Sequence, residues 1–137
     1  MLLGLLTSFF EMYILLDIGF IVFHTVLILF NLFGWIWEAT RRWNLFTLLL
    51  TAFSWFVLGI WYGFGYCPCT DWHWQVRQEL GYTEMPSSYI EFLVELLTGL
   101  NFSTVLVDTA TGILFFWALV VSLYVNFQDF EKKRIVS

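Results

Sequence analysis

The fold is decided by residues 13–38, which read YILLDIGFIVFHTVLILFNLFGWIWE. Apart from a regular set of polar side chains, this run is almost wholly apolar and aromatic. Seven residues make just under two turns of α-helix, so side chains spaced by seven share one face with a drift of about 20° per step. Polar groups facing lipid are costly, so we expect this face to contact protein or trapped water. The face is the polar stripe, which consists of Asp17, His24, Asn31 and Glu38.

The composition indicates that lipid surrounds most of the chain. It is 60% hydrophobic, 22% aromatic and only 12% charged, whereas soluble proteins average about 25% charged residues. The mean hydropathy is +0.78. We therefore expect the lipid bilayer to be a partner. The few basic residues form no extended patch, and no nucleic-acid partner is expected.

The apolar runs predict an all-α integral membrane protein in one domain, residues 1–137. A membrane span needs about 20 apolar residues, and such runs occupy about 14–37, 43–65 and 104–127. Residues 2–10 are expected to be an interfacial segment or an extension of the first span. The expected bundle has three transmembrane helices plus an interfacial or partial fourth helix.

The polar region 66–103 contains two signals for short helices. Thr70 or Asp71 can cap a helix that runs through Leu80. Ser88 and Glu91 match the S-x-x-E capping box, which predicts the partial fourth helix at about 88–100.

The basic residues predict the orientation of the chain. Five of the six lie in the turn 38–42 or in the C-terminal tail, as Arg41, Arg42, Lys132, Lys133 and Arg134. Cytoplasmic loops are enriched in such residues. We therefore expect a bacterial inner-membrane protein with the turn 38–42 and the C-terminus in the cytoplasm. The N-terminus and the loop 66–103 would lie outside.

The polar stripe has two interpretations. One is a proton path, cofactor site or binding groove in which His24 changes its charge near neutral pH. The other is a seam of interhelical hydrogen bonds that fixes the register of the helices. The second interpretation is favoured for Asn31 and Glu38, while both stay open for Asp17 and His24.

The outer loop carries the second candidate set: Cys67, Pro68, Cys69, Thr70, Asp71 and His73. Two cysteines around a proline can serve redox chemistry on the outer side, where disulfides persist. They can equally be inert thiols in a loop that the proline holds. The same stretch has ligand types for zinc, but alternating ligands within a few residues would make an unusual cage, and no metal is expected.

A third candidate set is an acidic outer face made of Glu91, Glu95 and Asp108. Paired carboxylates can attract cations, but a solvated face is the simpler account.

Several of these residues also carry a resemblance. The histidine of the first span, the stretch GYCPCTDWHW at 65–74, Gly81-Tyr82 and SYIEF at 88–92 resemble a family of small bacterial membrane proteins. That family is known only as a domain of unknown function, with Cys-Pro-Leu-Thr in its outer loop. The resemblance covers about residues 13–127 and implies that Cys67 is the family's cysteine, whereas Cys69 replaces a leucine. It implies no activity.

Three functions follow as hypotheses. The first is an accessory or assembly subunit with protein partners in a larger membrane complex. The second is a redox-linked membrane protein using Cys67 and Cys69, or a haem or quinone near His24. The third is a proton- or cation-handling bundle built on the polar stripe. No cofactor is expected, because bis-histidine haem ligation would need His73, which the loop should keep away from the first span.

Overall fold

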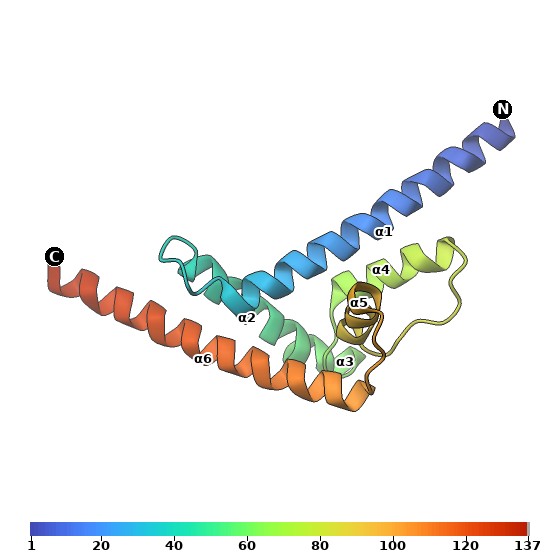
Figure 1. Ribbon diagram of the computed structural model, residues 1–137. Coiled ribbons are helices and arrows are strands. Elements are labelled where there is room, and N and C mark those ends of the chain that lie inside the picture. Colours follow the sequence, from blue (N-terminus) through green and yellow to red (C-terminus); the bar gives the residue numbers. More distant parts are fainter. Residues whose placement is uncertain (137) are drawn as a thin grey trace.

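The computed structural model describes residues 1–136, whose regular elements are all helices (Figure 1). Three of them are long and apolar enough to cross a membrane. They are α1 (Leu2–Phe33), the composite helix Arg41–Tyr62, and α6 (Thr104–Val136). Two short helices, α4 (Pro68–Glu79) and α5 (Tyr89–Thr98), lie between the second and third. The predicted all-α bundle of three spans with an additional helix is confirmed.

Helix α1 includes the predicted extension at its start and ends earlier than the predicted first span. Residues 2–10 continue the helix, and the helix ends at Phe33 and not at residue 37. The amide of Gly34 donates to the Phe30 carbonyl at 2.8 Å. A Cβ at residue 34 would lie 2.6 Å from that carbonyl oxygen and 2.9 Å from Nδ2 of Asn44. Only glycine allows the second span to approach this closely.

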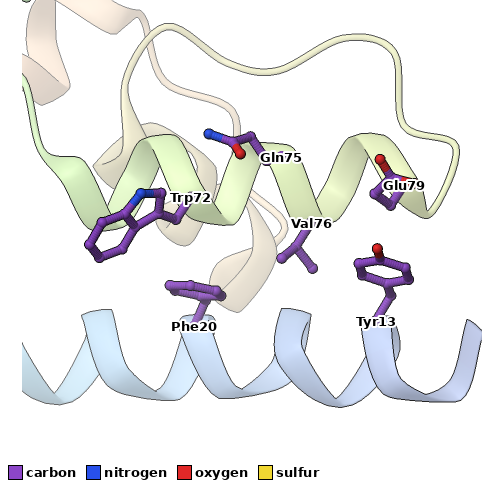
Figure 2. A pocket seen from close by; sticks show the side chains of 6 residues that line it. All are labelled: Tyr13, Phe20, Trp72, Gln75, Val76 and Glu79. Carbon is purple, nitrogen blue, oxygen red and sulfur yellow. The ribbon is translucent and has the colours of Figure 1, made fainter. Parts of the chain in front are cut away.

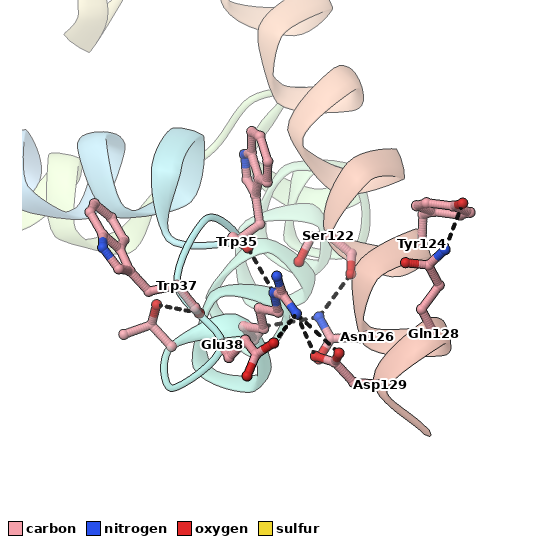
Figure 3. Close-up of polar contacts among 10 residues, drawn as sticks. Trp35, Trp37, Glu38, Ser122, Tyr124, Asn126, Gln128 and Asp129 are labelled. Atoms are coloured by element: carbon pink, nitrogen blue, oxygen red, sulfur yellow. Dashed lines mark hydrogen bonds and ion pairs between the residues drawn. The ribbon is translucent and has the colours of Figure 1, made fainter. Parts of the chain in front are cut away.

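The second span starts as α2 (Arg41–Phe53) and packs along α6. Leu48, Phe115 and Ala118 form the buried core between these helices. At their shared end, Nη1 of Arg41 lies 3.0 Å from the Asp129 carboxylate, and Asn126 donates to the Arg41 carbonyl at 3.0 Å (Figure 3). Helix α6 therefore continues beyond the predicted span end at residue 127, because Asp129 on its next turn still has a partner.

The far end of the second span turns back on itself, which the sequence did not predict. After α2 the helix widens to a π-helix, η1 (Ser54–Leu58), and ends as α3 (Gly59–Tyr62). Gly65 then donates to the Trp55 carbonyl at 3.4 Å, and Ser54 donates to the Tyr66 carbonyl at 2.6 Å. The helix therefore ends at Tyr62, three residues before the end of the predicted span 43–65. Residues 63–66 return along the helix, and Cys67 lies beside the span.

Helices α4 and α5 fill the space that α1 and α6 leave as they diverge (Figure 1). Cys67 is the N-cap of α4, so the predicted cap at Thr70 or Asp71 is wrong by one turn. Pro68 occupies the first helical position, where proline is favoured because the amide of that residue would have no hydrogen-bond partner within the helix.

Helix α5 begins as predicted. Ser88 caps it by accepting a hydrogen bond from the Glu91 amide at 3.4 Å. Tyr89, Phe92 and Leu93 of α5 make the second buried cluster.

Candidate functional site

The first part of the site is a thiol beside an imidazole. His24 on α1 is 4% exposed, and its Nδ1 lies 3.1 Å from the Phe20 carbonyl. A carbonyl only accepts, so Nδ1 carries a hydrogen and Nε2 faces the other way. Nε2 lies 3.9 Å from Sγ of Cys67 and 3.5 Å from Oγ1 of Thr70. In an imidazole whose one hydrogen is on Nδ1, Nε2 is the acceptor, and here it faces the thiol.

The surroundings favour the thiolate of Cys67. Burial acts to raise the pKa of this thiol, but contact with His24 and hydrogen bonds from the amide and hydroxyl of Thr70 outweigh it and lower the pKa to about 7. The N-terminus of α4 acts in the same direction, as it favours negative charge. By contrast, burial and the neighbouring Cys67 raise the pKa of Cys69. Both cysteines are free thiols.

Behind this pair lies a buried polar relay, which runs from Asp17 through His73 to Tyr89. Nε2 of His73 lies 2.7 Å from Oδ1 of Asp17, and Nδ1 lies 2.8 Å from the Tyr89 hydroxyl. The carboxylate accepts, so Nε2–H donates to it and the phenol donates to Nδ1. Arg77 also donates to Asp17 at 3.1 Å. The guanidinium lies 3.9 Å from the Tyr82 ring centroid and 4.7 Å from that of Phe92.

Burial favours the neutral form of His73 in this relay. The side chain of His73 is 0% exposed, and its ring stacks on Phe20 with centroids 5.2 Å apart. Desolvation lowers the pKa of His73, although Asp17 opposes the shift. Desolvation also raises the pKa of the Tyr89 phenol, which therefore stays a donor.

Tyr89 joins the two parts of the site. Its ring centroid lies 4.1 Å from that of His24 and 5.6 Å from that of His73. The expectation that His73 stays away from the first span is therefore wrong, since His73 bonds to Asp17 on α1. The cause is the return of the chain at 63–66, which brings α4 against α1. For His24 itself, Nδ1 lies beside the Phe20 carbonyl and Nε2 lies beside Cys67 and Thr70.

The polar stripe does not form one continuous row. Asn31 belongs to a seam with the second span: Thr47 donates to its Oδ1 at 2.7 Å, and its Nδ2 donates to Thr51 at 3.1 Å. Glu38 lies beyond the end of α1, with 80% of its side chain exposed and Arg41 at 3.7 Å. The prediction that it shares the helix face is wrong, because Gly34 ends the helix first.

The remaining predicted residues are more scattered. The Asp71 carboxylate accepts from the Tyr66 hydroxyl at 3.5 Å, and Glu91 accepts from Thr104 at 2.8 Å. Glu95 and Asp108 are exposed. The structure therefore does not gather the acidic outer face into one cluster. Within residues 1–136 no group of three or more histidine, cysteine or acidic side chains is placed to hold a metal ion.

A groove of about 360 Å³ lies between α1 and α4. Figure 2 shows Phe20 and Tyr13 of α1 facing Trp72, Val76 and Glu79 of α4 across it. Its apolar end is one turn of α1 from His24. Its other end carries the polar groups of Tyr13 and Glu79 (Figure 2).

Sequence reasoning missed two members of the site, Arg77 and Tyr89. Arg77 could have been predicted, because it is the one lysine or arginine outside the two basic clusters and lies in an acidic region. Such a charge needs a carboxylate partner when it is buried. Nothing in the sequence indicated a role for Tyr89, which is simply the first helical residue after the Ser88 cap.

These observations define a class: an α-helical membrane protein in which a short helix returns against the first span and places a thiol beside a buried histidine. The chain belongs to the family described as Protein of Unknown function (DUF2784), whose family model matches residues 14–127. The matched range contains the thiol pair and the whole relay. No curated protein and no solved structure matches the chain.

Proposed function

We propose that this protein is a redox-active thiol protein of the membrane, in which Cys67 is the reacting group and His24 is its base. The observation that carries the proposal is the 3.9 Å approach of Sγ to Nε2 of His24. Nucleophilic cysteines are activated by such a base or by a helix N-terminus, and Cys67 has both.

The chemistry follows from the two thiols. The Cys67 thiolate attacks an oxidant that has a weak O–O or S–S bond, and the leaving atom takes the proton held by His24. Cys69 then attacks the oxidised sulfur of Cys67. The sum is loss of two electrons and two protons from the dithiol, which becomes the Cys67–Cys69 disulfide. Because His24 already contacts Cys67, Thr70 and Phe20, we propose no haem at this position.

Single-cysteine variants test this proposal. Cys69→Ser leaves Cys67, and Cys67→Ser leaves Cys69 as the matched control. At pH 7 we expect iodoacetamide to alkylate Cys67 about tenfold faster or more, because far more of it is thiolate. His24→Phe keeps a ring against Tyr89 but removes the nitrogens, and it should reduce the difference. Equal rates for the two cysteines would contradict the proposal.

A specific observation also supports the accessory-subunit hypothesis. Residues 2–12 of α1 are all exposed, and this end of the helix extends beyond the other helices (Figure 1). A protein partner in a membrane complex would cover them. Purification in mild detergent followed by native mass analysis tests this second candidate. We expect a complex that Leu5→Ala with Phe9→Ala dissociates; an isolated chain would contradict it.

The proposed location is the bacterial inner membrane, with the loop 66–103 outside and the turn 38–42 in the cytoplasm. Supporting this orientation, the turn and the C-terminal end of α6 lie at one end of the molecule (Figure 1). Arg41 and Asp129 link them at 3.0 Å. Both basic clusters would then face the cytoplasm.

A further inference from the structure

His24 needs support in order to face Cys67. The bond between its Nδ1 and the Phe20 carbonyl, at 3.1 Å, fixes one nitrogen only. The ring can still tilt at this bond, and a tilt would move Nε2 away from Sγ of Cys67, which lies 3.9 Å from it. In reactive sites a misplacement of about 1 Å can cost a hundredfold in rate. The reactivity of Cys67 therefore depends on what holds the face of the imidazole.

Tyr89 covers the face of His24. The two ring centroids lie 4.1 Å apart, which is closer than the ~4.5–7 Å usual for aromatic pairs. Phe23 also contacts the imidazole, but edge-on, with the centroids 5.6 Å apart. Behind Tyr89 lie Trp74 and Phe92, whose ring centroids are 5.2 Å and 5.6 Å from that of Tyr89. Tyr89 is therefore placed to keep the imidazole from tilting.

A hydrogen bond fixes where the ring of Tyr89 lies. Ring contacts alone tolerate a range of offsets, whereas the phenol hydroxyl donates to Nδ1 of His73 at 2.8 Å. His73 is itself held, because its Nε2 lies 2.7 Å from Oδ1 of Asp17 on α1. Arg77 donates to the same oxygen at 3.1 Å. The relay thus ties α5 to α1, the helix that carries His24.

We infer that Tyr89 and His73 are positioning residues for the reactive thiol, an inference that rests on the proposed function above. Asp17 anchors His73, and His73 holds the hydroxyl of Tyr89. The ring of Tyr89 in turn holds the imidazole of His24 toward Sγ of Cys67. Tyr89 and His73 act through His24, by fixing its geometry and not by adding charge.

Tyr89→Phe tests this most directly, because it removes one hydroxyl and keeps the ring. The phenol is uncharged near pH 7, so a change in the reactivity of Cys67 reports geometry and not a lost charge. In the Cys69→Ser background we expect the pH midpoint of iodoacetamide alkylation to rise by about one unit. The rate at pH 7 then falls about fivefold, because less of the sulfur is thiolate.

Tyr82→Phe is the matched control. It also removes a phenol hydroxyl, from a ring that packs on Arg77 with the guanidinium 3.9 Å from its centroid and that does not belong to the relay. We expect it to leave the pH midpoint of Cys67 alkylation unchanged.

Position 73 offers a second matched pair. Asparagine and leucine have nearly the same shape, but Oδ1 of asparagine can take the place of Nδ1 and accept from the Tyr89 hydroxyl. We expect His73→Asn to keep the midpoint near that of Cys69→Ser alone, and His73→Leu to raise it as Tyr89→Phe does. Both variants lose the bond to Asp17, so a difference between them isolates the bond to Tyr89.

The outcomes separate this inference from the proposed function. A midpoint of about 7 in Cys69→Ser alone upholds the proposed function. If Tyr89→Phe then has the same midpoint as Tyr82→Phe and only a lower unfolding temperature, the relay is purely structural and the inference is overturned. Equal midpoints in folded His73→Asn and His73→Leu would also overturn it, and Tyr89→Phe decides alone if His73→Leu does not fold. A midpoint near 8.5 in Cys69→Ser alone, as for an ordinary cysteine, would overturn both.

Discussion

At the residue scale, Asp17 is the group on which the buried relay depends. It accepts from His73 and Arg77 at once, so its loss leaves two donors without a charged acceptor. We predict that Asp17→Asn lowers the free energy of unfolding by about 1.5–3 kcal/mol, as for hydrogen bonds to charged groups. Thermal unfolding in detergent measures this. Glu11→Gln on the exposed surface of α1 is the control, and an equal loss in both would contradict the relay.

His73 makes stability depend on pH. Its pKa is lowered in the folded protein, so the unfolded chain binds a proton more readily. The contribution of His73 is therefore present above its unfolded pKa of about 6.5 and is lost as the pH falls below it. We predict that unfolding temperatures drop between pH 7 and pH 5, and that His73→Gln reduces this dependence. A wild-type unfolding temperature independent of pH would contradict neutral burial of His73.

The residues differ in how far their positions could be predicted. Asn31 could be assigned to an interhelical seam, because an amide within a span needs partners there. The contact between His24 and Cys67 could not, since it depends on where residues 63–66 turn. Nothing in those residue types specifies the direction in which the chain leaves a span.

At the scale of the elements, Gly34 decides where α1 ends. An added Cβ would meet the Phe30 carbonyl at 2.6 Å and Asn44 at 2.9 Å, so backbone must shift. We predict that Gly34→Ala costs about 1–3 kcal/mol of stability, as overpacking does. Gly112→Ala in α6 is the control, because its Cβ would meet nothing within 4 Å. Unfolding in denaturant compares them, and equal stability would contradict the close approach of the second span.

The elements themselves were largely predictable. The apolar runs gave all three spans, and Ser88 gave the start of α5 because its side chain caps a helix in any context. The π-helix Ser54–Leu58 was not predictable. Its first two residues bond to the returning chain through the Ser54 hydroxyl and the Trp55 carbonyl. Such bonds between residues ten or more apart leave no local sequence pattern.

At the scale of the whole molecule, the orientation can be tested with new cysteines in a chain lacking Cys67 and Cys69. Glu84→Cys lies in the loop 66–103, and Lys132→Cys lies near the basic end of α6. We predict that a membrane-impermeant maleimide labels only Glu84→Cys in intact bacterial cells, and both after lysis. Labelling of only Lys132→Cys in intact cells would reverse the orientation.

The fold brings the thiol of Cys67 from the loop 66–103 to His24 within α1. The central claim is that this contact activates Cys67. The most direct measurement is the pH dependence of iodoacetamide alkylation in Cys69→Ser. The lowered pKa predicts a half-maximal rate at a pH of about 7, and a shift to higher pH in His24→Phe. A midpoint near that of an ordinary cysteine, about 8.5, unchanged by His24→Phe, would contradict the account.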